Sequence, residues 1–568
     1  MKLILKEYLT SLKERKELDA ILPDLLSEIG MTVFSKPGIG TRQQGVDVAA
    51  YGAIVPNVEK VYLFSIKSGD ITRAVWDGDA HQSLRPSLNE ILDAYIPNRI
   101  PNQYKDKPVV ICICFGGDVQ EQVRESFEGF KKANSSKGIE FEEWNGDMLA
   151  ELILKSFLRE DLMPKTFRSS FRKSLALLDE PAISFKHYSN LINSILNVKF
   201  KNNKERITKL RQLNICLWIL FSWCRESNNL ESAYLSAELT ILRTWEICCA
   251  FFNKKDENAK SIQSIFQSIQ LLHRQISNEY VKKIMPHGYK LHGISNAIKP
   301  LNDVDVNFKL FDLIGRIALN GIWSYWYFTI SDEKSKLTYV EDIQIHSRLI
   351  KEIIINNPML YYPYKDDHII EISFVAWFLS LHEINHNDIH NWILDLLRGI
   401  KFNYEVNNKY PCILKDYYDL INHPVEKTLE YKKEVTSASV LYPTLALFAA
   451  VLGHEDNYSE IQKFKKSELE HSNFQLWYPD ETTEKHFYKN DDLHGATFSN
   501  VPIEKSSKEF LTEVFDECEA TVHFENLSAI KYGLFPLVLV GCRHYRIPMP
   551  IHFIKMLYIK KNLPIITK

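Results

Sequence analysis

The chain has 568 residues, of which 45% are hydrophobic and 12% aromatic, and its formal net charge is −3. This length and apolar content suffice for more than one buried core, so we expect two or more domains. A net charge near zero excludes a globally basic surface, although it is compatible with a local basic patch. The N-terminal stretch is too charged for a signal peptide, and the most apolar later stretch, residues 214–224, is too short to span a bilayer. We therefore expect a cytoplasmic protein that makes no contact with a membrane.

Residues 1–160 alternate helix and strand signals. An apolar stripe at helical spacing runs through residues 16–30 and is stopped by Gly30. The runs at 46–54 and 60–69 are typical of two strands joined as an antiparallel hairpin. The other expected elements are strands at 31–36, 108–115 and 139–144 and helices at 79–96, 118–134 and 148–158, the last with Asp147 as N-cap. This order predicts a mixed α/β layer.

The rest of the chain has a different character. Residues 161–185 are typical of a connector. From about residue 186 to 568, long amphipathic helical patterns dominate and strand signals are rare, without a repeat of fixed period. The nine scattered cysteines form no CxxC pair, which favours buried thiols in a reducing compartment over disulfides or a zinc ribbon. We expect a large all-α C-terminal domain that acts as a sensor, a regulator or an oligomerisation domain.

The hairpin carries one carboxylate and one ammonium group in otherwise apolar strands. Asp47 stands at the head of its first strand, and Lys67 stands near the end of its second. In an antiparallel pair these two ends are neighbours, and Ser65 shares a face with Lys67 because side chains alternate along a strand. Hydrolysis of a phosphodiester needs oxygen ligands for a hard cation and a positive charge near the phosphate. The hairpin is therefore our candidate active site, and the alternative is a cross-strand ion pair with a structural role only.

These residues also carry a family resemblance. The run "GVD", then seventeen residues, then "SIK", after an N-terminal helix, resembles the PD-(D/E)XK restriction-endonuclease-like superfamily in its Mrr-type branch. The Gly-rich loop "GIGTRQQGVD" and the strand–helix–strand order after Lys67 resemble the same branch. The resemblance covers about residues 1–160 only. It implies a restriction-endonuclease-like α/β core that hydrolyses DNA with Mg²⁺, for which Mn²⁺ is expected to substitute.

The resemblance also implies roles for individual residues. Asp47 would bind the metal together with the backbone carbonyl of Ile66, and Lys67 would act on the attacking water. Position 65 is Ser, where the family usually has Asp, Glu or Gln, so the sequence leaves the catalytic role of Ser65 open. A further metal-binding carboxylate is then expected from one of four positions, namely Asp19 in the opening helix or Asp77, Asp79 or Glu90 after the hairpin.

The segment after Lys67 would lie beside this site. Arg73, Gln82 and Arg85 are candidates for contacts with DNA phosphates, and Trp76 is a candidate for packing on a sugar or base. The alternative is an ordinary solvated helix face with one buried Trp.

A second motif indicates a different chemistry. His382, Glu383 and His386 match HExxH, the zincin signature, and Glu405 has the spacing of a third ligand. A zincin needs both His on one continuous helix. The local pattern instead predicts that one helix ends at the motif and that the next begins with Asn387 or Asp388 as its N-cap. We expect a polar helix–helix junction there.

The sequence as a whole predicts a metal-dependent DNA endonuclease with a helical regulatory domain. By analogy with Mrr-type nucleases that are fused to accessory regions, we expect a role in prokaryotic defence against foreign DNA. The alternatives are a catalytically degenerate protein that binds nucleic acid or a partner, and a zinc metallopeptidase. DNA is the expected partner, and the sequence leaves open a second copy of the chain and a ligand or partner protein for the helical domain.

Overall fold

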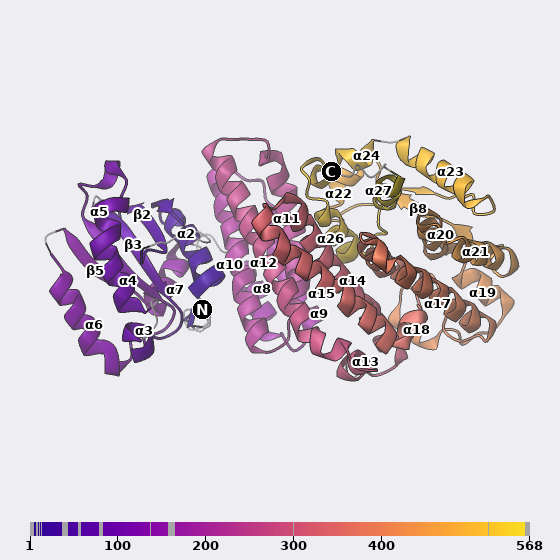
Figure 1. The fold of residues 1–568 in the computed structure, drawn as a ribbon, viewed down its shortest axis with the longest axis horizontal. Helices are drawn as coiled ribbons and strands as arrows, with labels where there is room; N and C mark the ends of the chain where they lie inside the picture. The colour runs from indigo at the N-terminus through magenta and orange to yellow at the C-terminus, as the bar shows by residue number, and fades with distance from the viewer. Residues whose placement is uncertain are drawn as a thin grey trace. The chain divides into compact units, whose positions relative to one another are not determined.

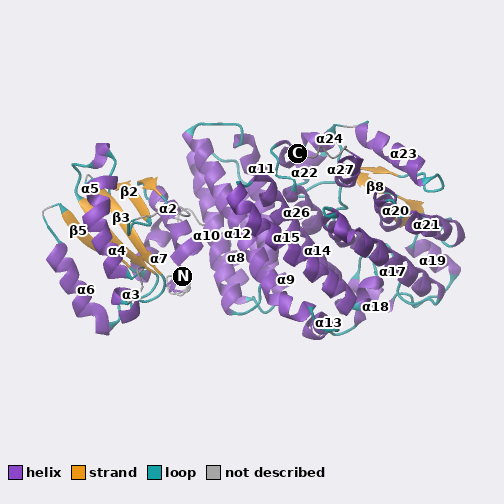
Figure 2. Ribbon diagram, in the orientation of Figure 1, coloured by secondary structure: helices purple, strands orange, loops and turns teal. Residues whose placement is uncertain are grey.

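The N-terminal strands form one mixed sheet of five strands in the order β1-β2-β3-β4-β5 (Figure 2). The first three strands pair antiparallel, and β3, β4 and β5 run parallel to one another. The strands are β1 (Thr32–Ser35), β2 (Val48–Gly52), β3 (Lys60–Lys67), β4 (Val109–Phe115) and β5 (Ile139–Trp144). The sequence-based prediction of an antiparallel hairpin is confirmed, because β2 and β3 pair from Val48 opposite Phe64 to Gly52 opposite Lys60.

Strand β4 lies inside the sheet and every one of its residues is buried. Its alternate side chains serve two faces. Val109, Ile111, Ile113 and Phe115 join an apolar core with β3, whereas the thiols of Cys112 and Cys114 fall between them in the strand. All nine cysteines of the chain are free thiols and eight of them are buried, as the scattered spacing predicted.

Helices pack against the sheet and complete the α/β part of the chain. Val61 and Leu63 of β3 share their core with Trp76, Leu84 and Phe127, which come from the helices after β3 and after β4. The helical elements of this part are η1 (Glu14–Leu18, a π-helix), α2 (Asp19–Glu28), α3 (Arg73–Asp77), α4 (Leu84–Glu90), η2 (Ile91–Tyr95, a π-helix), α5 (Ile96–Arg99), η3 (Asn102–Tyr104), α6 (Glu121–Asn134) and α7 (Gly146–Ser156). Gly30, with φ +93°, follows the end of α2 as its sequence position predicted.

This computed structural model describes residues 5–6, 9–10, 12, 14–36, 44–54, 58–78, 83–136, 138–156, 165–298, 300–520 and 522–562 (Figure 1). The chain divides into two compact units. Unit 1 comprises residues 1–240 and 253–272, and unit 2 comprises residues 241–252 and 273–568. The two-part layout of an α/β region followed by a helical region is therefore present. The predicted domain limits at about 160 and 186 stay predictions.

Helices after residue 164 complete unit 1 and continue into unit 2. Most of the predicted connector 161–185 is helical, since α8 and α9 cover residues 165–176 and 181–196. The helices are α8 (Lys165–Ala176), α9 (Pro181–Leu196), α10 (Asn203–Glu226), α11 (Glu231–Cys248), η4 (Cys249–Phe251) and α12 (Glu257–Gly288). The long α10 begins at a side-chain cap, in which Asn202 Oδ1 accepts from the Glu205 N–H at 2.9 Å.

Unit 2 is built from helices and short strand pairs. Its longer helices are α14 (Asp303–Ile330), α15 (Glu333–Asn356), α16 (Ile369–Ser380), α17 (His386–Glu405), α20 (Leu441–Leu452), α21 (Glu455–Ser467), α23 (Ser507–Glu519), α26 (Pro536–Tyr545) and α27 (Ile551–Asn562). The shorter helical elements are α13 (Gly293–Ile298), η5 (Pro358–Tyr361), η6 (Asp366–His368), η7 (Glu383–Asn385), α18 (Tyr417–Asn422), α19 (Leu429–Val435), α22 (Thr483–His486), α24 (His523–Asn526) and α25 (Ser528–Lys531). The strands are β6 (Ala438–Ser439), β7 (Asn473–Phe474), β8 (Leu476–Tyr478) and β9 (Ala496–Phe498).

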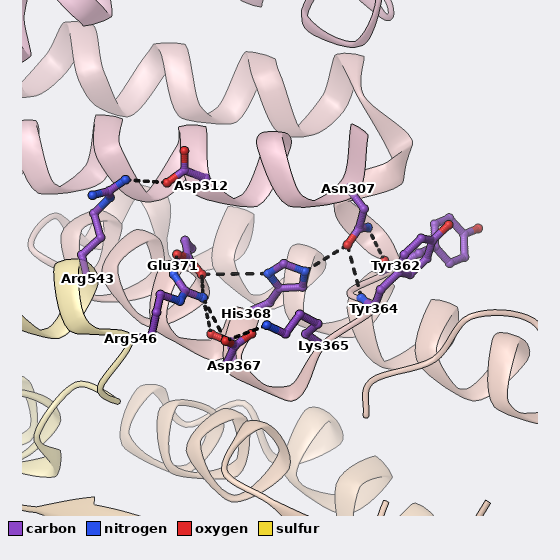
Figure 3. A network of polar contacts seen from close by, with 10 residues as sticks. All are labelled: Asn307, Asp312, Tyr362, Tyr364, Lys365, Asp367, His368, Glu371, Arg543 and Arg546. Carbon is purple, nitrogen blue, oxygen red and sulfur yellow. Dashed lines mark hydrogen bonds and ion pairs between the residues drawn. The ribbon is translucent and has the colours of Figure 1, made fainter. Parts of the chain in front are cut away.

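A polar network joins α14, α16 and α26 of unit 2 (Figure 3). Asp312 on α14 accepts from Arg543 on α26 at 2.6 Å. Glu371 on α16, which is 1% exposed, pairs with Arg546 at the end of α26. Burial lowers the pKa of His368 to about 3, so this imidazole is neutral and its Nε2 lies 3.0 Å from Asn307 Oδ1. Side chains far apart in the sequence thereby fix these helices to one another.

One local expectation needs correction. The helix α7 is capped by Asn145 and not by Asp147, because Asn145 Oδ1 accepts from the Met148 N–H at 3.0 Å. Asp147 instead forms an ion pair with Lys6 at 2.8 Å.

In the part of the chain that the structure describes, no helix combines the length and the apolar character needed to cross a bilayer.

Candidate active site

Asp47 lies immediately before β2, where the antiparallel ladder ends. Its backbone N–H donates to Phe64 O at 2.8 Å, and its carboxylate Oδ2 accepts from the Ile66 N–H at 2.7 Å. Gly45 makes this approach feasible. It has φ +79°, and a Cβ at this position would lie 2.1 Å from the carbonyl oxygen of Ser87 on α4. Glycine therefore lets the chain pass against α4 and enter β2 with Asp47 directed at β3.

The backbone of Ile66 turns its polar groups toward Asp47. In a strand, the N–H and C=O of one residue point to the same neighbouring strand. Since the Ile66 N–H donates to Asp47, its carbonyl points to that side as well. The last pair of the β2–β3 ladder is Val48 with Phe64, so this carbonyl lies beyond the paired part of β2. The Ile66 carbonyl and the Asp47 carboxylate therefore lie on the same side of β3.

Lys67 and Ser65 lie at the buried end of β3. Lys67 is only 7% exposed, and its Nζ lies 3.5 Å from Glu14 Oε1. Ser65 is buried, and its hydroxyl has no hydrogen-bond partner among the described residues. An unpaired buried hydroxyl costs free energy unless something binds it.

Glu14 is the site residue that sequence reasoning missed. It begins η1, a π-helix that continues directly into α2. The i→i+5 bonding of a π-helix winds more widely than an α-helix, so residues five positions apart come closer to one face. Both Glu14 and Asp19 act electrostatically on Asp47. The only sequence signal for Glu14 was its acidity in a stretch rich in charge, and the family resemblance favoured Asp19.

The electrostatics of the group are dominated by carboxylates. The pKa of Asp47 is raised to about 6, chiefly by burial and to a smaller extent by Glu14 and Asp19. The Ile66 N–H and Lys67 oppose this shift. When all are ionised, three carboxylates face one ammonium group, which leaves two net negative charges. Such an excess of negative charge in a largely buried place favours a bound cation.

The donor set suits a hard divalent cation. The oxygen-bearing groups of this part of the chain are the carboxylates of Asp47, Glu14 and Asp19, the Ile66 carbonyl and the Ser65 hydroxyl. Among the residues that the structure describes, no three His, Cys, Asp or Glu side chains are grouped closely enough to hold an ion by themselves. Mg²⁺ in proteins commonly takes one or two carboxylates and keeps several waters, so it needs no third side chain.

The other predicted site residues are placed less closely. Glu90 is half-buried at the end of α4, three residues after Ser87. Asp77 pairs with Arg85 at 3.1 Å on the surface, so each of the two has a partner. Arg73 is exposed in the first turn of α3. Gln82 and Asp79 lie outside the described residues.

The prediction that Trp76 packs on a nucleic acid is wrong. Trp76 is 3% exposed, and its ring meets the edges of Phe127 and Phe130 on α6 at centroid distances of 5.3 and 5.6 Å. Its indole is part of the core between α3 and α6. The alternative from the sequence, one buried Trp on a solvated helix, is confirmed.

The HExxH residues do not share a helix. Helix α16 ends at Ser380, a 3₁₀ turn covers Glu383–Asn385, and α17 begins at His386. The predicted helix–helix junction is therefore confirmed, although the N-cap is Asn385 and not Asn387 or Asp388. Glu405 is the last residue of α17, five turns from His386. This arrangement contradicts a zincin site, since its two His must lie one turn apart on a continuous helix.

Comparisons with family models, with curated proteins and with solved structures gave no match to this chain. The resemblance to the PD-(D/E)XK superfamily therefore stays a prediction from the residues of the hairpin.

Proposed function

We propose that this chain is a Mg²⁺-dependent DNA endonuclease whose active site is the group Asp47, Ser65, Ile66, Lys67 and Glu14. The observation that carries the proposal is the bond from the Ile66 N–H to the Asp47 carboxylate, with Lys67 two residues along β3 from a buried, unpaired Ser65. This arrangement brings a carboxylate, a backbone carbonyl and an ammonium group together at one end of a hairpin. Residues that only pack the core would not need a carboxylate, a carbonyl and an ammonium group side by side.

Each residue has a task that follows from its position. Asp47 and the Ile66 carbonyl provide oxygen ligands from two neighbouring strands. Glu14 supplies a second carboxylate in place of the neutral Ser65, and it holds Lys67 at 3.5 Å. Lys67, which is largely withdrawn from water, orients the attacking water and offsets the negative charge that builds on the phosphate. A divalent cation bound there supplies an acidic water and polarises a phosphate oxygen.

The biological setting of the proposal rests on analogy. We propose a defence role against foreign DNA, with the helical part of the chain acting as a regulator that responds to a ligand or a partner.

The test is cleavage of plasmid and linear DNA by purified full-length protein in Mg²⁺ and Mn²⁺, with EDTA as the metal-free control. We expect metal-dependent cutting that falls by at least about a hundredfold in Asp47→Ala, in Lys67→Ala and in Glu14→Gln. Two surface variants of the same unit, Asp106→Asn and Lys105→Ala, serve as matched controls and should cut normally. Cutting that persists in Asp47→Ala would overturn the assignment of the site.

A catalytically degenerate nucleic-acid-binding protein is the second candidate. The observation that favours it is Ser65, which places a neutral side chain where the family usually has a ligand. Against it stands Asp19, a carboxylate within electrostatic reach of Asp47 that supplements Glu14. Binding of labelled DNA that depends on Arg73 and Arg85, without cutting in any metal, would establish this candidate.

A further inference from the structure

A cavity in unit 2 opens at the HExxH residues that the zinc hypothesis leaves unexplained. Its volume is about 450 Å³, and it is lined by α14, α15 and the junction between α16 and α17, including His382 and Asn385. That volume lies within the range of sites that bind small molecules. The residues of the motif that do not bind zinc therefore form one wall of a potential ligand site.

Aromatic and aliphatic side chains form a wall of fixed orientation. Tyr325 and Phe328 lie one turn apart on α14, and Ile343 of α15 lines the same cavity. The ring of Tyr325 meets Trp377 at 80° with centroids 6.3 Å apart. The Trp377 indole N–H in turn donates to Phe553 O at 2.9 Å. These contacts fix the orientation of the Tyr325 ring, and an aromatic wall of fixed orientation suits a ligand with a flat aromatic body.

Positive charge lies beside this wall without acidic residues in the lining. Arg348 and Lys351 lie one turn apart on α15, and the cavity lining contains no Asp or Glu. Lys351 bonds Asn385 at 3.1 Å and Asp388 at 3.1 Å, which fastens α15 to the junction. Arg348 is exposed and has no hydrogen-bond or ion-pair partner in the described part of the chain. Its guanidinium is therefore available for an anion.

A buried hydroxyl in the same lining also lacks a partner. Ser347 precedes Arg348 on α15 and is 8% exposed, and its Oγ forms no hydrogen bond with any described residue. The Oγ atom is shielded from solvent in this conformation, so a molecule in the cavity reaches it only if the Ser347 side chain turns toward the cavity. Buried polar atoms in native proteins are nearly always bonded, so an unpaired one beside a cavity favours such a partner.

We propose that this cavity binds a small molecule with a flat aromatic body and one anionic group, the body against Tyr325 and Phe328 and the anion on Arg348. The anion is a carboxylate or a phosphate, which share this recognition chemistry. The proposal is independent of the nuclease assignment, because all its residues belong to unit 2.

The test uses two fluorescent probes with the same aromatic body. Anilinonaphthalene sulfonate carries an anionic sulfonate, which stands in for the carboxylate or phosphate, and phenylnaphthylamine is its neutral counterpart. We expect full-length protein to bind the sulfonate with one saturable site and at least about tenfold more tightly than the neutral probe. Equal affinity for the two probes would overturn the anionic part of the proposal.

Variants locate the site. Arg348→Ala should weaken binding of the sulfonate probe about tenfold, and Arg348→Lys should restore part of it, while the neutral probe is unaffected. Arg172→Ala, an exposed Arg on α8 of unit 1, is the matched control and should bind normally. Because Arg348 is exposed, its variants should fold, and far-ultraviolet circular dichroism checks this. Unchanged sulfonate affinity in Arg348→Ala would overturn the proposal.

Competition separates the two sources of the anion. Adenosine monophosphate and indole acetate are tested for displacement of the sulfonate probe, each beside its uncharged relative, adenosine or tryptophol. Displacement by the phosphate alone assigns an aromatic phosphate, and displacement by the carboxylate alone assigns an aromatic acid. Displacement by both supports the shared chemistry, and equal displacement by the uncharged relatives contradicts it.

Discussion

At the scale of single residues, Asp47 is the group on which the proposal depends. Its carboxylate is largely buried, bonded to one backbone N–H and faced by Glu14 and Asp19. A carboxylate kept only for a cross-strand ion pair would have its pKa lowered by its partner. The pKa of Asp47 is instead raised to about 6, so the folded state disfavours the ionised form of this carboxylate. A residue with a purely structural role would not need to carry that cost in stability.

The first prediction concerns pH. Asp47 must be ionised to bind a cation, and its pKa is about 6. We expect cleavage to rise about tenfold per pH unit below that value and to level off above it. The measurement is the single-turnover rate between pH 5 and pH 8. Because protons and metal compete for one carboxylate, a higher Mg²⁺ concentration should lower the apparent midpoint. A flat rate over this range contradicts the role of Asp47.

The second prediction separates function from stability. A raised carboxyl pKa means that the folded state binds the proton more tightly than the unfolded chain. The stabilising contribution of protonated Asp47 is therefore complete below the unfolded pKa and is lost as pH rises through about 6. At pH 8 without metal, Asp47→Asn should raise the free energy of unfolding by about 1 to 3 kcal/mol while it abolishes cleavage. Urea unfolding in EDTA measures this.

The control for that experiment is Asp106→Asn, an exposed residue of the same unit, which should leave stability unchanged. Added Mg²⁺ should raise the melting temperature of the wild type and not that of Asp47→Asn. A loss of stability in Asp47→Asn would favour the alternative, in which Asp47 forms a cross-strand ion pair with a structural role only.

At the scale of elements, the helices of unit 1 hold the carboxylate helix in place. Glu17 in η1 is fully buried, and Arg225 at the end of α10 donates to its two carboxylate oxygens at 2.8 and 3.3 Å. Glu28 at the end of α2 accepts from Arg211 of α10 at 2.9 Å. Helix α10 therefore fixes both ends of the segment that presents Glu14 and Asp19 to Asp47.

The third prediction tests this link. Arg225→Ala removes the positive charge that faces the buried carboxylate of Glu17, so we expect a loss of about 3 to 5 kcal/mol in the free energy of unfolding of unit 1. Cleavage should also fall, since Glu14 lies three residues from Glu17. Replacement of both residues, Glu17→Gln with Arg225→Ala, should recover part of the stability. If Arg225→Ala unfolds and cuts like the Arg172→Ala control, the link is absent.

At the scale of the whole molecule, each unit contains its own ion pairs in which at least one of the two charged groups is buried. Unit 1 relies on Glu17 with Arg225, and unit 2 relies on Glu371 with Arg546 and on Asp312 with Arg543 (Figure 3). The nearby cations hold the pKa of Asp312 well below its usual range, so this carboxylate stays ionised. Pairs of this kind contribute most when broken, because one charge is then left without a partner.

The fourth prediction uses calorimetry of the full chain. We expect Arg546→Leu to lower the thermal transition of unit 2 and Arg225→Ala to lower that of unit 1, each by an amount equivalent to about 3 to 5 kcal/mol. Cleavage activity after mild heating assigns the unit 1 transition. Equal shifts of a single transition by both variants would contradict separate stabilisation of the units.

The sequence by itself predicted the elements whose causes are local. Two apolar runs separated by a short polar turn predicted the β2–β3 hairpin, and an antiparallel hairpin brings Asp47 at the start of one strand near Lys67 at the end of the other. The end of α16 before the HExxH residues was also predictable, since the apolar stripe of α17 starts anew.

Only the tertiary structure decided which polar side chains meet. Glu14 faces Lys67 because η1 winds as a π-helix and α10 holds it, and neither fact is visible in a local period. Trp76 is buried because α6, about fifty residues later, covers it. Arg546 meets Glu371 across about 175 residues of chain. Local propensity and periodicity fix the direction of the backbone, whereas the burial and pairing of charges depend on segments that only folding brings together.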